Sequence, residues 1–580
     1  MAAVVMSWIY MTLVCGCIGG GVIALLFRAA GIKTAYLKSG AKATGVGVAG
    51  SWVEKLSLTH CLMAGIVAIT VYVEIFSLFG KTGAVCHILM LLAAGAFGIA
   101  GRKIFLKEWE KYKKILFSWE GFFYAGILLL IAFFTSRGNF HTDTNIYHAQ
   151  MIRLYEEYGL IKGMGNLQLH FAYNSAYLAF ASVFSLRWLL GQSLHTTTGF
   201  VEAVMCLYAF HGLKDFKRHR RHTGDMMRVG ILLYTLVIVT GSMSPATDYA
   251  TMFLVLFVIT EWCDNLEKGG SVAVYSLLSI LAVFVVTLKF SACLLVLIVI
   301  YPAVILVKEK RWREIGVYFS CGCLILFPFL MRNFLISGWL LYPFNGIDLF
   351  TVEWKIPEEY LLMDANQIKV WGRCLYDVEK INWPVASWLP IWWEGQERYE
   401  KMLLGAMLFG TVLLAVLRIV KALAHRKVRW DMAVLLAAVF GSLTVWFFTA
   451  PFIRYGLAFI FAIPMIAAGE YLGEEKKGFY SILTGGLIFC IFVSISPYWD
   501  HYITDAGVFV KQSLKEPYYI CQKDYDRAEA GSLEINGNVI YYSTAGEVNT
   551  YHTFPSTCYQ FMLERSTLMG DNIKDGFKAK

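Results

Sequence analysis

The amino-acid sequence predicts an all-α polytopic membrane protein with about 14 transmembrane helices, external juxtamembrane helices and a small external α/β tail. Hydrophobic residues make up 57% of the 580 positions and charged residues only 16%, whereas a soluble domain has roughly 45–50% and about 25%. Apolar stretches recur along most of the chain, and basic residues gather between them. This composition excludes ordinary soluble enzymes and disordered proteins. We interpret the net charge of +9 as a topology signal and not as a nucleic-acid surface.

The predicted spans follow from the length of each apolar stretch, since a transmembrane helix needs about 20 mostly apolar residues. The candidates are 5–27, 58–80, 83–100, 119–135, 196–213, 228–243, 248–262, 271–288, 290–307, 315–336, 401–420, 431–449, 455–472 and 479–497. Residues 171–190 are also apolar, and their position has to be decided by the loops.

Five basic segments set the expected orientation, because lysine and arginine favour cytoplasmic loops. These segments are 28–57, 101–118, 214–222, 308–313 and 418–429. If residues 171–190 crossed the membrane, the basic cluster at 214–222 would lie outside. We therefore predict that 171–190 lies in or dips into the outer interface. The N-terminus, the loops 136–195 and 337–400 and the tail from residue 498 are then external.

Three regions result from this scheme. Residues 1–118 supply three N-terminal spans with basic cytoplasmic loops, residues 119–497 form a transmembrane core, and residues 498–580 form the external tail. In the tail, an Asn536–Gly537 turn between two short apolar runs predicts a β-hairpin. The sequence has 13 cysteines and no CxxC pair, which gives redox or metal frameworks little support. Cys521 and Cys558 both lie in the tail, and spacing alone leaves a disulfide between them open.

The most informative segment follows the fourth span and contains Asp143 just outside the membrane. Thr142 or Asp143 can cap a helix that begins there. Apolar and aromatic side chains then recur at helical spacing up to Gly159, which predicts an amphipathic helix over 144–158 on the outer leaflet. His141 and His148 flank Asp143. A divalent cation there is one interpretation, but polar loop histidines are the simpler one, so no metal ligand is assigned.

Other charged residues stand at the outer ends of predicted spans, where an unpaired charge is costly. They are Asp248, Lys289, Arg332 and Arg454. Snorkelling or structural ion pairing explains each one alone equally well. Together with Asp143 they indicate two carboxylates and three cations on one face. The 337–400 loop also carries seven of the 17 tryptophans, which are typical of interface anchoring and can also stack on sugars.

This order of elements resembles the GT-C glycosyltransferase superfamily, which includes protein O-mannosyltransferases and bacterial aminoarabinose transferases. In that superfamily a span leads into an external loop with an essential acidic residue, juxtamembrane helices and the next span. Here the corresponding parts are the span from Leu128 to Thr135, then Asp143, the 144–158 helix, the 171–186 segment and the 196–213 span. The string from Asp143 to Ser175 is also similar to a less characterised set of bacterial multispan proteins associated with surface-polysaccharide assembly. The likeness covers roughly 119–497.

The resemblance implies a glycosyltransferase that moves a sugar from a polyprenyl-phosphate carrier to a glycan, lipid or protein acceptor. The reaction would take place at the outer face of the cytoplasmic membrane. Asp143 would be the catalytic base, with Asp248 as the other catalytic candidate. Arg454, Lys289 and Arg332 would bind the donor phosphate. The resemblance adds Tyr147, His148 and Asn174 as substrate-binding candidates. Many relatives have adjacent acidic residues in this loop, whereas Thr144 follows Asp143 here. No cofactor is implied with certainty, and a divalent cation stays open.

Two other functional classes are also consistent with a protein that has many spans and several charged sites. A lipid-linked saccharide flippase or other transporter would place its charges mid-span and have short loops on both faces, whereas the 337–400 loop is long. A polysaccharide polymerase or ligase also uses external loops and arginines. A purely structural protein is the least favoured, because polar groups concentrate on one face.

Overall fold

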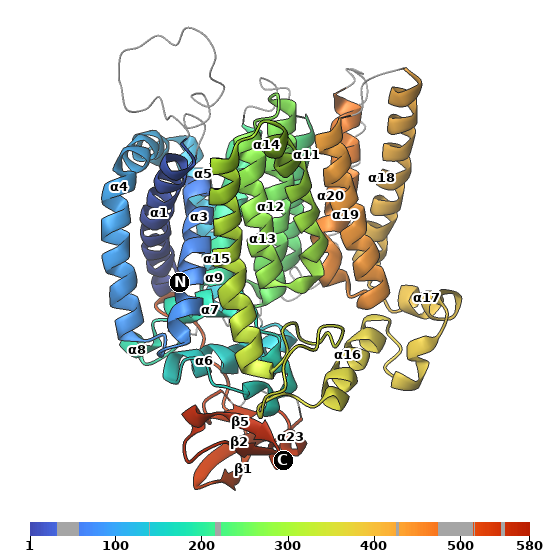
Figure 1. The fold of residues 1–580 in the computed structure, drawn as a ribbon. Coiled ribbons are helices and arrows are strands. Elements are labelled where there is room, and N and C mark those ends of the chain that lie inside the picture. Colours follow the sequence, from blue (N-terminus) through green and yellow to red (C-terminus); the bar gives the residue numbers. More distant parts are fainter. Residues whose placement is uncertain are drawn as a thin grey trace.

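The computed structural model describes residues 1–31, 57–138, 140–214, 222–424, 429–473, 514, 517–546 and 551–580. Most of these residues form a helical bundle, with several short helices and a small β-unit at one end (Figure 1). We refer to this end of the bundle, the lower one in Figure 1, as the site end. Among the described residues, eleven helices are long and apolar enough to cross a membrane. The chain is therefore a multi-pass membrane protein by the length and composition of its helices.

The N-terminal part consists of α1 (Ala2–Ala30), α3 (Leu58–Ser77), α4 (Ala84–Leu116) and α5 (Trp119–Arg137). Glycines let α1 and α3 approach closely: a Cβ added at Gly19 would lie 1.8 Å from the Cys61 carbonyl oxygen, and one at Gly65 would lie 2.0 Å from that of Cys15. Small residues at a helix contact are typical of membrane bundles. Ser118 begins α5 by accepting a hydrogen bond from the Gly121 backbone at 3.3 Å.

The centre and far side of the bundle contain the remaining long helices. They are α9 (Thr197–Leu213), α11 (His222–Ile238), α12 (Thr247–Glu267), α13 (Val272–Leu288), η6 (Phe290–Val299) with α14 (Ile300–Lys308), α15 (Trp312–Ser337), α18 (Arg398–Leu423), α19 (Trp430–Thr449) and α20 (Ile453–Leu472). Nearly every side chain of α12 is buried, so α12 is the central helix.

Short helices gather at the site end (Figure 1). They are η2 (Thr144–His148), α6 (Ala149–Glu157), η3 (Met164–Asn166), η4 (Leu169–Ala172), α7 (Ala176–Phe184), α8 (Arg187–Leu190), η5 (Val239–Gly241), α16 (Glu358–Gly372), η7 (Val378–Asn382) and α17 (Val385–Glu394). With nine residues, α7 is about 13.5 Å long, far short of a bilayer core of about 30 Å. This length agrees with the prediction that 171–190 does not cross.

Two contacts show how α9 and α11 are oriented in the bundle. Thr198, at the start of α9, donates a hydrogen bond to the Ser244 carbonyl at 2.6 Å, and Ile238, at the end of α11, lines a pocket with His141. Both helices therefore meet the site end with one terminus, so that Leu213 at the end of α9 and His222 at the start of α11 lie at the opposite end. Which membrane face each end meets stays a prediction.

The predicted count of 14 spans also stays a prediction. α9 and α13 have 17 residues each and are shorter than the eleven candidate spans. The predicted span 479–497 lies outside the described residues.

The tail forms two small sheets with short helices between them. Its elements are η8 (Pro517–Tyr519), β1 (Ala530–Ile535), β2 (Asn538–Ser543), β3 (Ser556–Thr557), α23 (Gln560–Glu564), β4 (Ser566–Leu568), η9 (Ile573–Asp575) and β5 (Phe577–Ala579). The predicted hairpin is confirmed: β1 and β2 are antiparallel, Ile535 faces Asn538, and Asn536 and Gly537 both have positive φ, as a two-residue type I′ turn requires. β3 joins β2 in parallel, and β4 pairs with β5 antiparallel.

The predicted surface position of the 144–158 helix is wrong. Both faces of η2 and α6 are covered, and Thr144, Gln150, Ile152 and Glu156 are buried along with the apolar stripe. The tail covers the polar side: Gln150 donates to Ser556 at 2.6 Å, and the Cys558 thiol lies 3.0 Å from the Ile146 carbonyl oxygen. Cys521 and Cys558 are free thiols, so the open question of a disulfide is answered against it.

Candidate functional site

Four of the predicted charged residues converge at the site end. Asp143 precedes η2, Asp248 is the second residue of α12, Lys289 separates α13 from η6, and Arg454 is the second residue of α20. The four lie far apart in the sequence, but each stands where a long apolar helix begins or ends. We call Asp143, Asp248, Lys289, Arg454 and the neighbouring His141 the charge cluster.

Arg454 connects the two carboxylates of the charge cluster. Its Nη2 lies 3.0 Å from Asp143 Oδ2 and its Nε lies 3.4 Å from Asp248 Oδ2. Lys289 also binds Asp248 and stands 3.6 Å from the centroid of the Tyr455 ring. The two carboxylates thus face two permanent cations, and the cluster is close to neutral when both acids are ionised.

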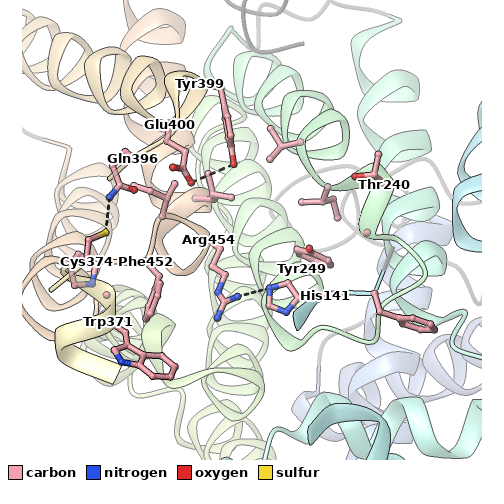
Figure 2. A pocket seen from close by; sticks show the side chains of 18 of the residues that line it. His141, Thr240, Tyr249, Trp371, Cys374, Gln396, Tyr399, Glu400, Phe452 and Arg454 are labelled. Atoms are coloured by element: carbon pink, nitrogen blue, oxygen red, sulfur yellow. Dashed lines mark hydrogen bonds between the residues drawn. The ribbon is translucent and has the colours of Figure 1, made fainter. Parts of the chain in front are cut away.

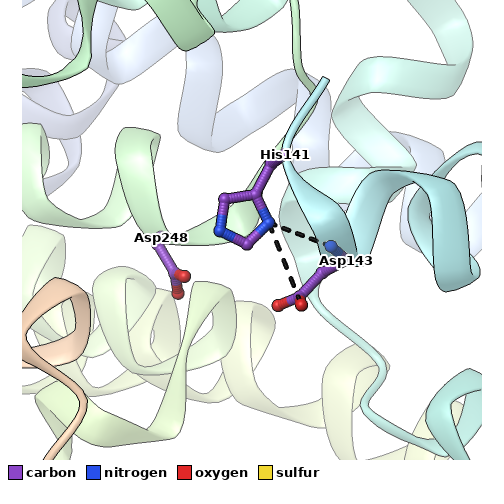
Figure 3. Close-up of side chains that lie close together, drawn as sticks. All are labelled: His141, Asp143 and Asp248. Atoms are coloured by element: carbon purple, nitrogen blue, oxygen red, sulfur yellow. Dashed lines mark hydrogen bonds and ion pairs between the residues drawn. The ribbon is translucent and has the colours of Figure 1, made fainter. Parts of the chain in front are cut away.

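His141 completes the cluster. Its Nε2 lies 2.6 Å from Arg454 Nη1, and its Nδ1 lies 3.9 Å from Asp143 Oδ1 (Figures 2 and 3). His141, Asp143 and Asp248 each offer one ligand atom, and these atoms lie within 4.8 Å of one another. Imidazole nitrogen and carboxylate oxygen suit a divalent cation. The same carboxylates are, however, already paired with Arg454 and Lys289.

The surroundings of Asp143 favour its ionised form. Burial raises the pKa of this carboxyl, but the nearby Arg454 and His141 outweigh burial and hold the pKa below its ordinary value. Burial also lowers the pKa of His141. The Asp143 side chain is 18% exposed, against 3% for Asp248, so Asp143 is the more accessible of the two acids.

Asp143 does not cap the following helix, contrary to one prediction. Its side chain makes no hydrogen bond to the backbone of η2 and instead binds Arg454. The first turn is π-helical, a form that is frequent at functional sites. Gly159 has a φ of 79° just after α6, which agrees with its predicted place at the helix end.

Tyr147 and His148 belong to η2, directly after Asp143, and both are buried. Burial, with a smaller contribution from Asp143, raises the pKa of the Tyr147 hydroxyl, and its ring stacks on His170 at 5.5 Å. Burial lowers the pKa of His148 to about 3, so its imidazole is neutral. His148 Nδ1 lies 3.1 Å from the Thr144 hydroxyl.

Arg332 and Asn174 bind each other and are not part of the charge cluster. Arg332 is fully buried, donates to Asn174 Oδ1 at 3.1 Å and has its Nε 3.9 Å from Glu74 Oε1. These contacts join α15 to α3 and to the segment before α7. Among the described residues, the ion pair of Arg332 is therefore with Glu74 and not with a carboxylate of the charge cluster. Glu74 is a single carboxylate inside an apolar span, and such a residue usually has a partner or a function. It was not among the predicted site residues.

The 337–400 loop contributes core as well as surface. Trp339, Trp388 and Trp392 are buried, and the Trp339 and Trp392 indoles each donate a hydrogen bond to a backbone carbonyl at 2.9 Å. Interface anchoring therefore does not account for these three, whereas Trp371 and Trp393 are about two-fifths exposed.

A pocket of about 400 Å³ adjoins the charge cluster (Figure 2). His141 and Arg454 form part of its wall. The other polar and aromatic residues of the wall come from η5, α12, the 337–400 loop, α18 and the segment before α20, and of these only Trp371 was among the residues with a predicted role. The volume falls within the range of about 300–1,000 Å³ that small-molecule sites occupy.

The chain was compared with protein families, curated proteins and solved structures. Residues 1–461 match the model of the family described as Domain of unknown function (DUF8201). The chain belongs to this family. The DUF8201 match begins with α1 and ends within α20, so it contains every residue of the charge cluster and leaves the tail outside. No curated protein matches the chain, and no solved structure matches it.

Proposed function

We propose that the protein is a glycosyltransferase that moves a sugar from a polyprenyl-phosphate carrier to an acceptor at the outer face of the cytoplasmic membrane. One observation carries the proposal: Asp143, Asp248, Lys289 and Arg454 meet at the mouth of the helical bundle, beside a pocket and under short helices. Apolar helices on either side suit the carrier chain. The acceptor is a glycan, lipid or protein of the cell envelope.

Asp143 is the base in this mechanism. An acceptor hydroxyl attacks the anomeric carbon, a new carbon–oxygen bond forms, and the bond to the carrier phosphate breaks. The hydroxyl proton goes to Asp143, and the polyprenyl phosphate leaves with the electron pair. General-base assistance contributes about 10²–10⁴-fold, and Arg454 and Lys289 stabilise the charge on the departing phosphate.

Arg454 also regulates the strength of this base. While Arg454 binds Asp143, the carboxylate is a weak proton acceptor, because its pKa lies below the ordinary value. A donor phosphate competes for the guanidinium, since phosphate is its natural bidentate partner. Donor binding then releases Asp143 from part of its ion pair, and the base becomes stronger once the donor is in place.

The test compares Asp143→Asn with the wild type in purified, nanodisc-embedded protein. The probes are undecaprenyl-phosphate-linked glucose, galactose, mannose and N-acetylglucosamine, with a membrane extract as the acceptor source. The variant should bind donor but release undecaprenyl phosphate at least ~10²-fold more slowly. Glu157→Gln is the matched control, because Glu157 is a partly exposed carboxylate on the neighbouring helix α6, paired with Arg187 at 3.2 Å. Near-normal release of undecaprenyl phosphate by Asp143→Asn would show that Asp143 is not the base, and Asp248 would be the next candidate.

A further inference from the structure

The pocket beside the charge cluster has two chemically different walls. Arg454 and His141 form one wall, and Glu400, Gln396 and Trp371 form another (Figure 2). Glu400 is the third residue of α18, whereas Trp371 belongs to α16 and Gln396 to the loop before α18. One wall therefore offers hydrogen-bond donors and positive charge, and the other offers acceptors and an aromatic face.

The acceptor wall has unused hydrogen-bonding capacity. Glu400 is half-buried, and its Oε2 accepts a hydrogen bond from the Glu397 backbone at 2.8 Å as part of a capping box. Its Oε1 receives only the Tyr399 hydroxyl at 3.4 Å, which is long for a bond between oxygens. No cation among the described residues pairs with Glu400. Gln396 uses its amide nitrogen on the Trp392 carbonyl at 2.6 Å, and its oxygen accepts nothing from the described part of the chain.

These features specify the ligand. A phosphate fits the Arg454 wall, because a guanidinium binds it with parallel hydrogen bonds. A group rich in hydroxyl donors fits the carboxylate and amide oxygens opposite. The indole of Trp371, 40% exposed, adds the flat apolar surface that small-molecule sites combine with a few polar groups. A sugar ring attached to a phosphate has all three properties.

We infer that this pocket is the subsite for the sugar of a glycosyl phosphate, with Glu400 as the residue that selects the sugar. This inference rests on the proposed function and adds the recognition of the transferred group. Glu400 accepts hydrogen bonds from ring hydroxyls, Trp371 covers one face of the ring, and Arg454 holds the phosphate at the end nearest Asp143.

The test measures equilibrium binding to the full-length protein in nanodiscs, without turnover. The probes are inorganic phosphate and the 1-phosphates of glucose, galactose, mannose and glucosamine. At least one hexose 1-phosphate should bind the wild type about tenfold more tightly than inorganic phosphate does. Glu400→Gln should abolish most of this preference and leave the affinity for inorganic phosphate unchanged. Glutamine still serves as the third residue of a capping box, so α18 is preserved.

Glu397→Gln is the matched control. It changes one charge in the same capping box, but Glu397 is exposed and does not line the pocket, so the preference for the sugar should persist. Equal affinities for inorganic phosphate and every hexose 1-phosphate would overturn the inference, as would a preference that survives in Glu400→Gln. If transfer from the undecaprenyl donors occurs while Glu400→Gln leaves the preference for the sugar unchanged, the assignment of the sugar subsite is wrong and the proposed function is retained. If the preference depends on Glu400 but no transfer occurs, the assignment of the sugar subsite is retained and the proposed reaction is wrong.

Discussion

Arg454 Nη2 lies 3.0 Å from Asp143 Oδ2, although the two residues are 311 positions apart. This pairing joins the start of α20 to the segment after α5, and it places a guanidinium beside the proposed base.

Replacing Arg454 should weaken the binding of the carrier phosphate. We expect undecaprenyl phosphate to bind Arg454→Lys about tenfold more weakly than wild type, because lysine cannot form the bidentate fork, and Arg454→Ala more weakly still. Affinity can be measured in nanodiscs. Arg418→Lys is the control, since Arg418 pairs with Glu470 at the opposite end of the bundle. Unchanged affinity in Arg454→Ala would transfer the phosphate-binding role to Lys289.

Removal of divalent cations should change the transfer reaction little. Both carboxylates of the cluster already have a cationic partner, Arg454 for Asp143 and Lys289 for Asp248. Release of undecaprenyl phosphate is therefore expected to continue after dialysis against EDTA. A loss that Mg²⁺ or Mn²⁺ restores would instead make His141, Asp143 and Asp248 the ligands of a required ion.

The packing of the tail should depend on pH through Glu156. Burial raises the pKa of this carboxyl to about 7. Both of its oxygens lie 3.1 Å from the Ser193 hydroxyl, and this hydroxyl also contacts Tyr551 of the tail. A raised pKa means that the stability is complete below the ordinary value of 4.5 and is lost as the pH rises through about 7. By pH 8 the loss should amount to about 3 kcal/mol.

Glu156→Gln should remove this dependence and stabilise the protein at pH 8 relative to wild type. Thermal unfolding between pH 5 and pH 8 checks the expectation, because the variant and the wild type should differ only at the higher pH. Glu309→Gln serves as the control, because Glu309 is exposed and pairs with Arg311 at 2.9 Å, away from Glu156; its effect should stay within about 0.5 kcal/mol at either pH. Parallel pH profiles for wild type and Glu156→Gln would contradict the prediction.

The orientation of the bundle is testable with reporter fusions. A reporter placed after Arg221 should be cytoplasmic, and one placed in the 337–400 loop should be external, because basic segments favour the cytoplasm. The reporters should thus give opposite signals in the same membrane. An external signal after Arg221 would reverse the scheme and place the charge cluster on the cytoplasmic side.

The sequence was sufficient to predict four residues of the charge cluster. Asp143, Asp248, Lys289 and Arg454 interrupt long apolar stretches, and the alternation of helices brings the ends of those stretches together. Arg332 has the same appearance in the sequence, but it lies beside Glu74 in α3. Which charges pair depends on helix packing, and helix packing cannot be derived from the apolar pattern of each helix alone.

The burial of the 144–157 segment was equally hard to predict. Its stripe of apolar residues indicates one protected face, but the other face is polar and is covered by β3 and its neighbours from the tail. Hydrogen bonds satisfy the polar groups there, so the sequence shows no apolar signal for that contact. The pocket wall around Glu400 was missed for a similar reason, because its residues come from two helices and a loop.

The contact between Cys558 and Ile146 spans 412 positions, and this separation sets an order of events during synthesis. A ribosome that adds about 5–20 residues per second needs about 20–80 s to make the intervening chain. Throughout that interval the polar side of the 144–157 segment lacks the strands that later cover it. All residues of the charge cluster are therefore made before the strands that cover the neighbourhood of Asp143, so that an interrupted translation product would carry the charge cluster without its cover.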